Sequence, residues 1–185
     1  MDSLNIPNKI TMFRIFIIPL FVVLLISDSR EGSMAAAVLF SIAALSDWLD
    51  GYLARTLNQV TTLGKLLDPI ADKILVTSAL IPLVELDRVA AWIAVVIIGR
   101  EIAMSGFRTI TAAQGIIIEA SNLGKYKTAL EIGAILFLIL DFHIYSIPFK
   151  SIGTVLIWAA MIFSIISAVD YFMKFRKNIQ TGTLT

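Results

Sequence analysis

Two short stretches decide how this chain folds: DWLDGYLAR at residues 47–55 and GKLLDPIAD at residues 64–72. Each lies within an otherwise apolar run. Together they contain four aspartates, Asp47, Asp50, Asp68 and Asp72. An aspartate at the centre of a membrane helix costs at least about 2.5 kcal/mol, so four of them are not expected to face lipid. We therefore expect the carboxylates to face the interior of a helix bundle or an aqueous cavity.

The spacing of the four aspartates predicts that they meet at one point. Asp47 and Asp50 are three residues apart, and Asp68 and Asp72 are four apart, so each pair lies on one face of a helix. The short connection makes the two helices antiparallel neighbours, with both pairs at a similar depth. Four converging carboxylates repel one another unless cations lie among them, and oxygen ligands suit Mg²⁺, Mn²⁺ or Ca²⁺. Four carboxylates can hold two ions, and paired metals about 3.5–4 Å apart are a known arrangement for phosphoryl displacement.

The composition is that of a membrane protein. Of 185 residues, 58% are hydrophobic, and the mean hydropathy of +0.87 exceeds what a soluble domain of this size can bury. The first apolar run lacks a signal-peptide cleavage site, so we expect it to be retained. The sequence contains no cysteine, fixed-period repeat or long linker, which predicts a single domain over residues 1–185.

The apolar runs are long enough for membrane helices of about 20 residues and do not alternate as strands do. They predict an all-α, polytopic membrane protein with six transmembrane helices. Basic residues gather on alternate connections and near both termini, so we expect both termini and the aspartates at the cytoplasmic face. The predicted spans are Pro7–Ile26, Met34–Thr56, Thr61–Leu86, Val89–Thr111, Lys125–Ile144 and Ser151–Phe175.

The two opening stretches match a known motif at every defined position. They resemble the CDP-alcohol phosphotransferase signature DxxDGxxAR(x8)GxxxDxxxD. The resemblance implies the six-helix fold and homodimer of that family, and Mg²⁺ or Mn²⁺ held by Asp47, Asp50, Asp68 and Asp72. It also implies that Asp72 is the general base and that a nucleotide pocket is formed by Gly51, Ala54, Arg55 and Gly64.

Alternatives remain open for these roles. Asp72 would otherwise be a purely structural metal ligand or would pair with Lys73, Lys65 or Arg108. The small residues of the motif would otherwise serve close packing of membrane helices.

Three further stretches resemble bacterial phosphatidylglycerophosphate synthases within this family: NIPNKITMFR at 5–14, GREIAMSGFR at 99–108 and GKYKT at 124–128. The resemblance implies transfer of the phosphatidyl group of CDP-diacylglycerol to sn-glycerol 3-phosphate, with release of CMP, in a bacterial plasma membrane. We expect membrane lipids but no nucleic acid as further partners. Asn8, Thr11 and Arg14 would close the nucleotide pocket or, alternatively, cap the first helix.

Four basic residues are candidates for binding the acceptor phosphate: Arg100, Arg108, Lys125 and Lys127. Arg100 lies well inside a predicted span, where a lone charge is costly, and we expect Glu101 to point elsewhere on that helix. Arginine forks and lysine ammonium groups both suit phosphate oxygens. The alternatives are a salt bridge of Arg100 with Glu101, Glu131 or a motif aspartate, and a purely topological role for the other three residues.

Two rival functions follow from the same residues. Another member of the family would use inositol phosphate, phosphatidylglycerol or serine as acceptor. A cation transporter would also place aspartates inside the membrane, although it needs polar groups at several depths rather than at one face.

Overall fold

A computed structural model of the chain describes residues 5–56, 61–113, 122–141, 143–144 and 147–180. In these residues the chain forms six helices and one pair of two-residue strands, so the all-α prediction is confirmed apart from this short hairpin. Each predicted span corresponds to one helix. The elements are α1 (Ile6–Ile26), α2 (Arg30–Thr56), α3 (Thr62–Glu85), α4 (Ala91–Ala113), α5 (Asn122–Ile139), β1 (His143–Ile144), β2 (Ile147–Pro148) and α6 (Phe149–Gln180).

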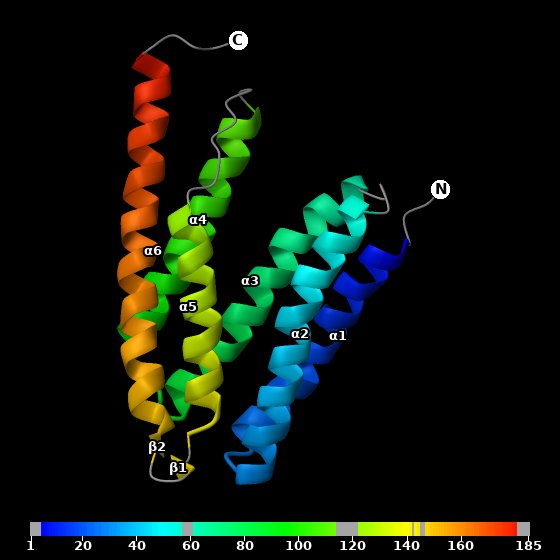
Figure 1. Ribbon diagram of the computed structural model, residues 1–185, viewed down its shortest axis with the longest axis vertical. Helices are drawn as coiled ribbons and strands as arrows, with labels where there is room; N and C mark the ends of the chain where they lie inside the picture. The colour runs from blue at the N-terminus through cyan, green and yellow to red at the C-terminus, as the bar shows by residue number, and fades with distance from the viewer. Residues whose placement is uncertain (1–4, 57–60, 114–121, 142, 145–146, 181–185) are drawn as a thin grey trace.

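The helices run up and down in two halves, α1–α3 and α4–α6, with both chain termini at the same end (Figure 1). The halves lie close together at the end that carries β1 and β2 and diverge toward the end that carries the termini. In the first half, α1 packs closely against both α2 and α3, whereas the direct contact between α2 and α3 is slight. The predicted neighbours α2 and α3 are therefore joined mainly through α1.

Polar side chains define where two of the helices begin. The side chain of Asn5 accepts a hydrogen bond from the backbone N–H of Asn8 at the start of α1, and Pro7 lies in the first turn. The side chain of Thr61 accepts a bond from the backbone N–H of Gly64 at the start of α3. Asn5 rather than Asn8 is thus the capping residue of α1, which leaves Asn8 for other contacts.

Arg88 holds the convergent end of the molecule together. Its guanidinium donates to the carbonyls of Leu138 and Ile139 at the end of α5, where helix carbonyls lack intrahelical partners. It also pairs with Asp28, at 2.5 Å, and with Asp141, at 3.5 Å. Asp28 adopts a left-handed backbone with φ of 45°, which aspartate tolerates better than most residues. One buried arginine therefore ties three connections together.

The apolar core occupies the same half of the bundle as Arg88. Phe21 of α1 and Phe40 of α2 pack with ring centroids 5.7 Å apart. Leu83, Ile97 and Leu138 bring α3, α4 and α5 into the same cluster. The polar residues of the opening motif lie in the other half of each helix, so the core fixes one end and leaves the other to the candidate site.

Large apolar side chains cover the outside of the bundle, as expected for a surface in contact with lipid. Phe16, Val95 and Val155 are examples, with exposed fractions of 75%, 69% and 68%. Three helices, in residues Pro7–Ile26, Arg30–Tyr52 and Phe149–Arg176, are long and apolar enough to cross a membrane. The helices α3, α4 and α5 carry the charged residues of the candidate site, which lowers their hydropathy. The chain is thus a helical membrane protein with at least three candidate spans.

Candidate active site

Arg14 lies at the centre of the acidic motif. Its Nη1 is 2.5 Å from Asp47 Oδ1 and its Nη2 is 2.5 Å from Asp50 Oδ2. The Arg14 side chain is fully buried, and that of Asp50 is 3% exposed. A guanidinium fork suits two such contacts, since its donors are fixed in one plane. Helix α1 therefore supplies a positive charge to two carboxylates of α2.

Thr11 connects Asp50 to the third aspartate. Its hydroxyl lies 3.0 Å from Asp50 Oδ2 and 3.1 Å from Asp68 Oδ1. A hydroxyl carries one proton and donates to one acceptor at a time, so the two carboxylates share a single donor here. Thr11 and Arg14 are one turn apart on α1, and together they bring Asp47, Asp50 and Asp68 to one face of that helix.

Three of the four carboxylates are linked through α1, since Arg14 contacts Asp47 and Asp50 and Thr11 contacts Asp50 and Asp68. Among the residues that the structure describes, no group of three or more acidic or histidine side chains surrounds a position suitable for one ion. Arg14 lies between Asp47 and Asp50, and Asp72 lies one helical turn beyond Asp68 on α3. Asp47 and Asp72 nevertheless line one cavity.

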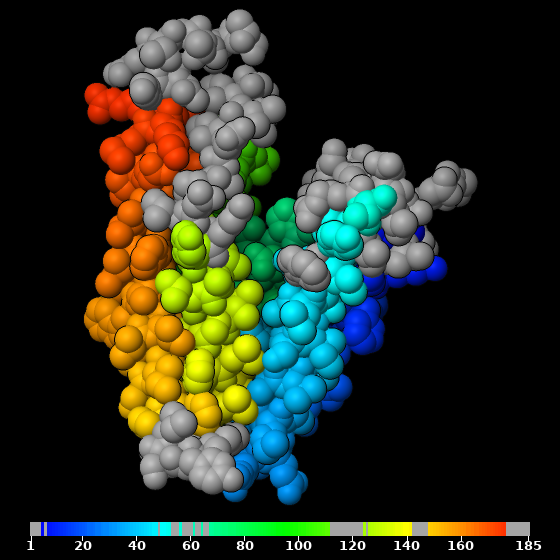
Figure 2. All heavy atoms as spheres, viewed as in Figure 1, coloured from blue at the N-terminus to red at the C-terminus, as the bar shows by residue number. Residues whose placement is uncertain are grey.

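This cavity, of about 620 Å³, separates the two halves of the molecule. Figure 2 shows the hollow between the two halves in the space-filling view. Asp47 and Asp72 lie on the wall formed by α2 and α3, and Arg100, Arg108 and Lys127 lie on the wall formed by α4 and α5. The structure thus brings predicted metal ligands and predicted acceptor-binding residues to one space. The remaining lining residues are Ala44, Pro69, Lys73, Glu101, Gly124, Thr128, Ala129 and Ile132.

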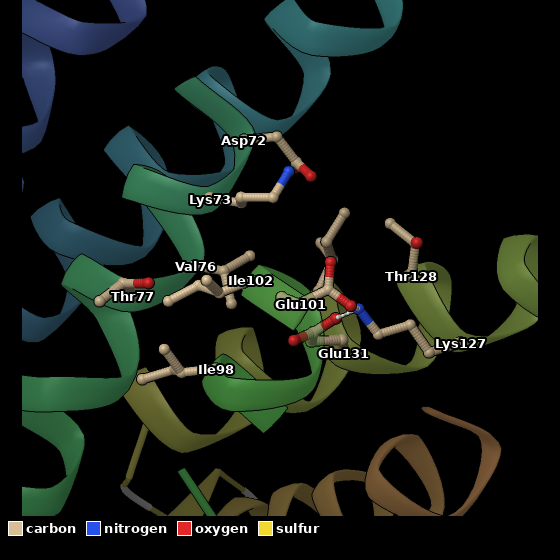
Figure 3. A pocket seen from close by; sticks show the side chains of 11 residues that line it. Asp72, Lys73, Val76, Thr77, Ile98, Glu101, Ile102, Lys127, Thr128 and Glu131 are labelled. Carbon is tan, nitrogen blue, oxygen red and sulfur yellow. Dashed lines mark hydrogen bonds and ion pairs between the residues drawn. The ribbon is translucent and has the colours of Figure 1, made fainter. Parts of the chain in front are cut away.

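A smaller pocket of about 20 Å³ lies beside Asp72 (Figure 3). Asp72 and Lys73 of α3 lie on one side of it, and Glu101, Lys127 and Glu131 lie on the other. Lys73 Nζ donates to the carbonyl of Pro69 at 2.9 Å. Among the described side chains, neither Lys73 nor Arg108 forms an ion pair with Asp72, so those two alternatives for Asp72 are not seen; the side chain of Lys65 lies outside the description.

Arg100 and Lys127 belong to a buried network of ion pairs. Lys127 Nζ lies 2.5 Å from both Glu101 Oε1 and Glu131 Oε2, and Arg100 Nη1 lies 2.5 Å from Glu101 Oε1. The Nη2 of Arg100 donates to Ser167 of α6. Two cations and two anions balance, so neither Arg100 nor Lys127 contributes an uncompensated charge to the cavity.

The expectation that Glu101 points away from Arg100 was therefore wrong, and the alternative, a salt bridge with Glu101, is what the structure contains. Adjacent residues on a helix leave the axis in different directions, but the long arginine side chain bends back to its neighbour. Glu101 and Glu131 were predicted only as alternative partners of Arg100. The spacing of Lys127 and Glu131, four residues apart within an apolar helix, is a signal for such a pair.

Arg108 differs from Arg100 and Lys127 because its side chain is exposed. Its guanidinium carbon lies 5.4 Å from the centre of the Tyr171 ring, a cation–π contact that holds the side chain beside α6. In the described residues it has no carboxylate partner, so it presents a net positive charge at the cavity. The side chain of Lys125, the fourth predicted acceptor-binding residue, lies outside the described part of the chain.

The residues predicted to bind nucleotide are only partly described. Asn8 and Thr61 exchange hydrogen bonds of 2.9 and 3.1 Å. A β-carbon added at Gly64 would lie 2.7 Å from Asn8 Oδ1, so glycine permits close approach of α1 to the start of α3. Gly51 is half-buried beside Asp50. The side chains of Ala54 and Arg55 lie outside the description. Asn8 and Thr11 thus contact α2 and α3 directly, as well as flanking the acidic motif.

The donor set fits a hard divalent cation. All four acidic groups of the motif are carboxylates, which are the ligands that Mg²⁺ and Mn²⁺ prefer. Four ionised carboxylates and the guanidinium of Arg14 together carry a formal charge of −3. Asp47 is 44% exposed and accessible from the cavity. A bound ion would either coordinate Asp47 and Asp50 alongside Arg14 or replace the contacts of Arg14 with these two carboxylates.

Comparison with known proteins identifies the group to which this site belongs. The family model described as CDP-alcohol phosphatidyltransferase matches residues 4–166. A protein of Bacillus subtilis named CDP-diacylglycerol–glycerol-3-phosphate 3-phosphatidyltransferase is 41% identical over 193 residues, covering 96% of this chain and 98% of the relative. A Rickettsia typhi protein of the same name is 37% identical over 169 residues, covering 91% and 95%. The chain therefore belongs to the CDP-alcohol phosphatidyltransferase family.

Proposed function

We propose that this protein transfers the phosphatidyl group of CDP-diacylglycerol to sn-glycerol 3-phosphate and releases CMP. It is a CDP-diacylglycerol–glycerol-3-phosphate 3-phosphatidyltransferase, in agreement with the names of its relatives. The observation that carries the proposal is the cavity with carboxylates on one wall and cationic side chains on the other. The carboxylate wall would hold the metal ions that bind the pyrophosphate, and the cationic wall would bind the phosphate of the acceptor alcohol.

Mg²⁺ or Mn²⁺ is the proposed cofactor, with two ions held by Asp47, Asp50, Asp68 and Asp72. When bound, such ions neutralise the charge of the pyrophosphate and of the departing CMP. Thr11 and Arg14 orient the carboxylates from α1, through the contacts at Asp50 described above. Residues Gly51, Ala54, Arg55 and Gly64 form the nucleotide pocket in this proposal, with Asn8 and Thr11 closing it from α1.

Asp72 is the proposed general base. Its carboxylate takes the proton of the acceptor hydroxyl as the hydroxyl oxygen forms a bond to the phosphorus of the phosphatidyl group. The bond from that phosphorus to the bridging pyrophosphate oxygen breaks, and its electron pair leaves with CMP. Asp72 suits this task because it lines the cavity and the described residues give it no ion-pair partner that would hold its oxygens.

Arg108 is the proposed principal contact of the acceptor phosphate. It is the exposed cation described above, and an arginine fork matches phosphate oxygens in geometry and charge. Arg100 and Lys127 line the same wall, but Glu101 and Glu131 already compensate them. Arg100 and Lys127 would therefore donate hydrogen bonds to the acceptor and fix the shape of the cavity, but they add no net positive charge to it. Lys125 completes the set in this proposal.

Six membrane spans, a homodimer and a bacterial plasma membrane are also part of the proposal. The three helices that are less apolar carry charged residues that line the cavity or form the network beside it, which is compatible with six spans. The open end carries both termini (Figure 1). We assign that end to the cytoplasm, because basic residues gather there. The soluble acceptor then enters from the cytoplasm and CDP-diacylglycerol enters from the bilayer.

The test is an assay of purified protein with CDP-diacylglycerol and one labelled acceptor at a time. We expect product with sn-glycerol 3-phosphate, and none with inositol phosphate, phosphatidylglycerol or serine. Product with another acceptor alone would assign the protein to a different branch of the family. Transport of divalent cations into vesicles without CDP-lipid would support the transporter alternative instead.

A further inference from the structure

Arg14 occupies an unusual position for a cation in a metal site. It contacts two of the four motif aspartates, each at 2.5 Å, from a side chain that is fully buried. Its third nitrogen, Nε, is buried and has no hydrogen-bond partner in the described residues. A guanidinium cannot lose its charge at physiological pH. A permanent positive charge therefore lies in contact with two of the carboxylates that are proposed to hold the metal.

The geometry points to competition rather than to simple support. A fixed positive charge within hydrogen-bond distance of two carboxylates repels any cation that these carboxylates would bind. Arg14 bridges the pair of aspartates, joining Oδ1 of Asp47 to Oδ2 of Asp50. The same Oδ2 of Asp50 also lies 3.0 Å from the Thr11 hydroxyl, which shares its proton between Asp50 and Asp68.

The negative charge of the aspartates explains why the Arg14 guanidinium stabilises this part of the fold. Breaking a buried ion pair by removing one partner is strongly destabilising, because an uncompensated charge remains. Asp47, Asp50 and Asp68 would repel one another on two helices that make little direct contact. Arg14 and Thr11 hold these helices to α1 through the carboxylates themselves.

We infer that Arg14 is an internal competitor of the divalent cation: it holds Asp47 and Asp50 in its absence and lowers its affinity for the site. This inference rests on the proposed metal site. The consequence is that the protein alone binds metal weakly. The pyrophosphate of CDP-diacylglycerol supplies the additional oxygen ligands that shift the balance, so tight metal binding is coupled to arrival of the donor.

The experiment measures Mn²⁺ binding by electron paramagnetic resonance to purified, chelator-treated protein without CDP-lipid. We expect Arg14→Gln to bind Mn²⁺ about tenfold or more tightly than the unmodified protein, a change of about 1.4 kcal/mol. In chelator its thermal midpoint should fall, and Mn²⁺ should raise that midpoint more than in the unmodified protein. Lys9→Gln is the matched control: it removes one exposed charge from the same helix and should change neither quantity.

Arg14→Lys provides a second variant if Arg14→Gln does not fold. A lysine is a point charge that cannot fork to both carboxylates, so we expect an affinity between those of the other two proteins. Unchanged or weaker Mn²⁺ binding in the Arg14 variants, with binding retained by the unmodified protein, would overturn the inference and leave the proposed function intact. Failure of every protein to bind Mn²⁺ would overturn the proposed metal site together with the inference.

Discussion

Lys127 Nζ and Glu101 Oε1 lie 2.5 Å apart and join α5 to α4 along the wall of the cavity. Lys127 also pairs with Glu131, whose side chain is 2% exposed. Replacing Lys127 with Met leaves Glu131 without its cation and Glu101 with Arg100 alone. We expect the free energy of unfolding to fall by about 3–5 kcal/mol, measured from thermal or denaturant unfolding in detergent.

Lys174 offers a matched control for that prediction. It pairs with Asp170 at 2.8 Å, with the same spacing of four residues along one helix, but its side chain is 47% exposed. An exposed pair of this kind contributes about 0–1 kcal/mol, so Lys174→Met should change stability little. Similar decreases in the free energy of unfolding of the two variants would show that burial does not make the Lys127 ion pairs more stabilising than an exposed pair.

Asp72→Asn tests the proposed general base. The amide keeps the size of the side chain but is not a base, so we expect turnover to fall by about 10²–10⁴-fold. Binding of CDP-diacylglycerol should persist, since three other carboxylates remain for the metal. The measurement compares kcat with donor affinity determined by equilibrium binding. Asp170→Asn is the control, because Asp170 lies on α6 and does not line the cavity. Full activity of the Asp72 variant would remove it as the base.

The sequence was sufficient to predict the helices. Long apolar runs predicted a helix at each of the six places, and three of these helices are long and apolar enough to cross a membrane. The errors lie at ends set by local contacts. α2 begins at Arg30 rather than Met34, and α5 ends at Ile139, five residues earlier than predicted, because His143 and Ile144 pair in a hairpin with the strand before α6. Such ends depend on turns and tertiary contacts that hydropathy does not encode.

The partners of the charged residues were much harder to predict. The motif identified the four aspartates, but the place of Arg14 between Asp47 and Asp50 depends on how α1 packs against α2 and α3. The pairing of Arg100 with Glu101 contradicts the usual divergence of neighbours on a helix. Each of these side chains has several oppositely charged residues within reach, and only the three-dimensional packing of the helices determines which of them it contacts.

Arg108→Ala tests the acceptor site. Arg108 is the exposed cation on the cavity wall, and its loss removes a charge-assisted contact to the acceptor phosphate. We expect the KM for sn-glycerol 3-phosphate to rise by about 10–100-fold, as a charged hydrogen bond contributes about 1.5–3 kcal/mol. The KM for CDP-diacylglycerol should remain within about twofold. The control is Arg176→Ala, an exposed residue of α6. An equal rise in both KM values would indicate general damage to the site.

Gly64→Ala tests the close approach of α1 to α3. The added β-carbon would lie 2.7 Å from Asn8 Oδ1 and 3.2 Å from Thr61 Oγ1. Asn8 is 2% exposed, and its hydrogen bonds with Thr61 prevent it from turning aside without loss. We expect a loss of about 1–3 kcal/mol in stability, as for other overpacked positions. Activity should also fall, because Thr11 and Arg14 lie on the same helix as Asn8.

Gly106→Ala makes the same chemical change where there is room for it. Among the described residues, no atom beyond the local backbone and chain neighbours of Gly106 lies within 4 Å of the β-carbon that this substitution would add to α4. Alanine favours the helix over glycine by up to about 1 kcal/mol, so this variant should be as stable as the unmodified protein or more so. The two substitutions should therefore shift the thermal midpoint in opposite directions. A stabilising effect of Gly64→Ala would mean that Asn8 yields easily, and that the register of α1 beside the acidic motif does not depend on this contact.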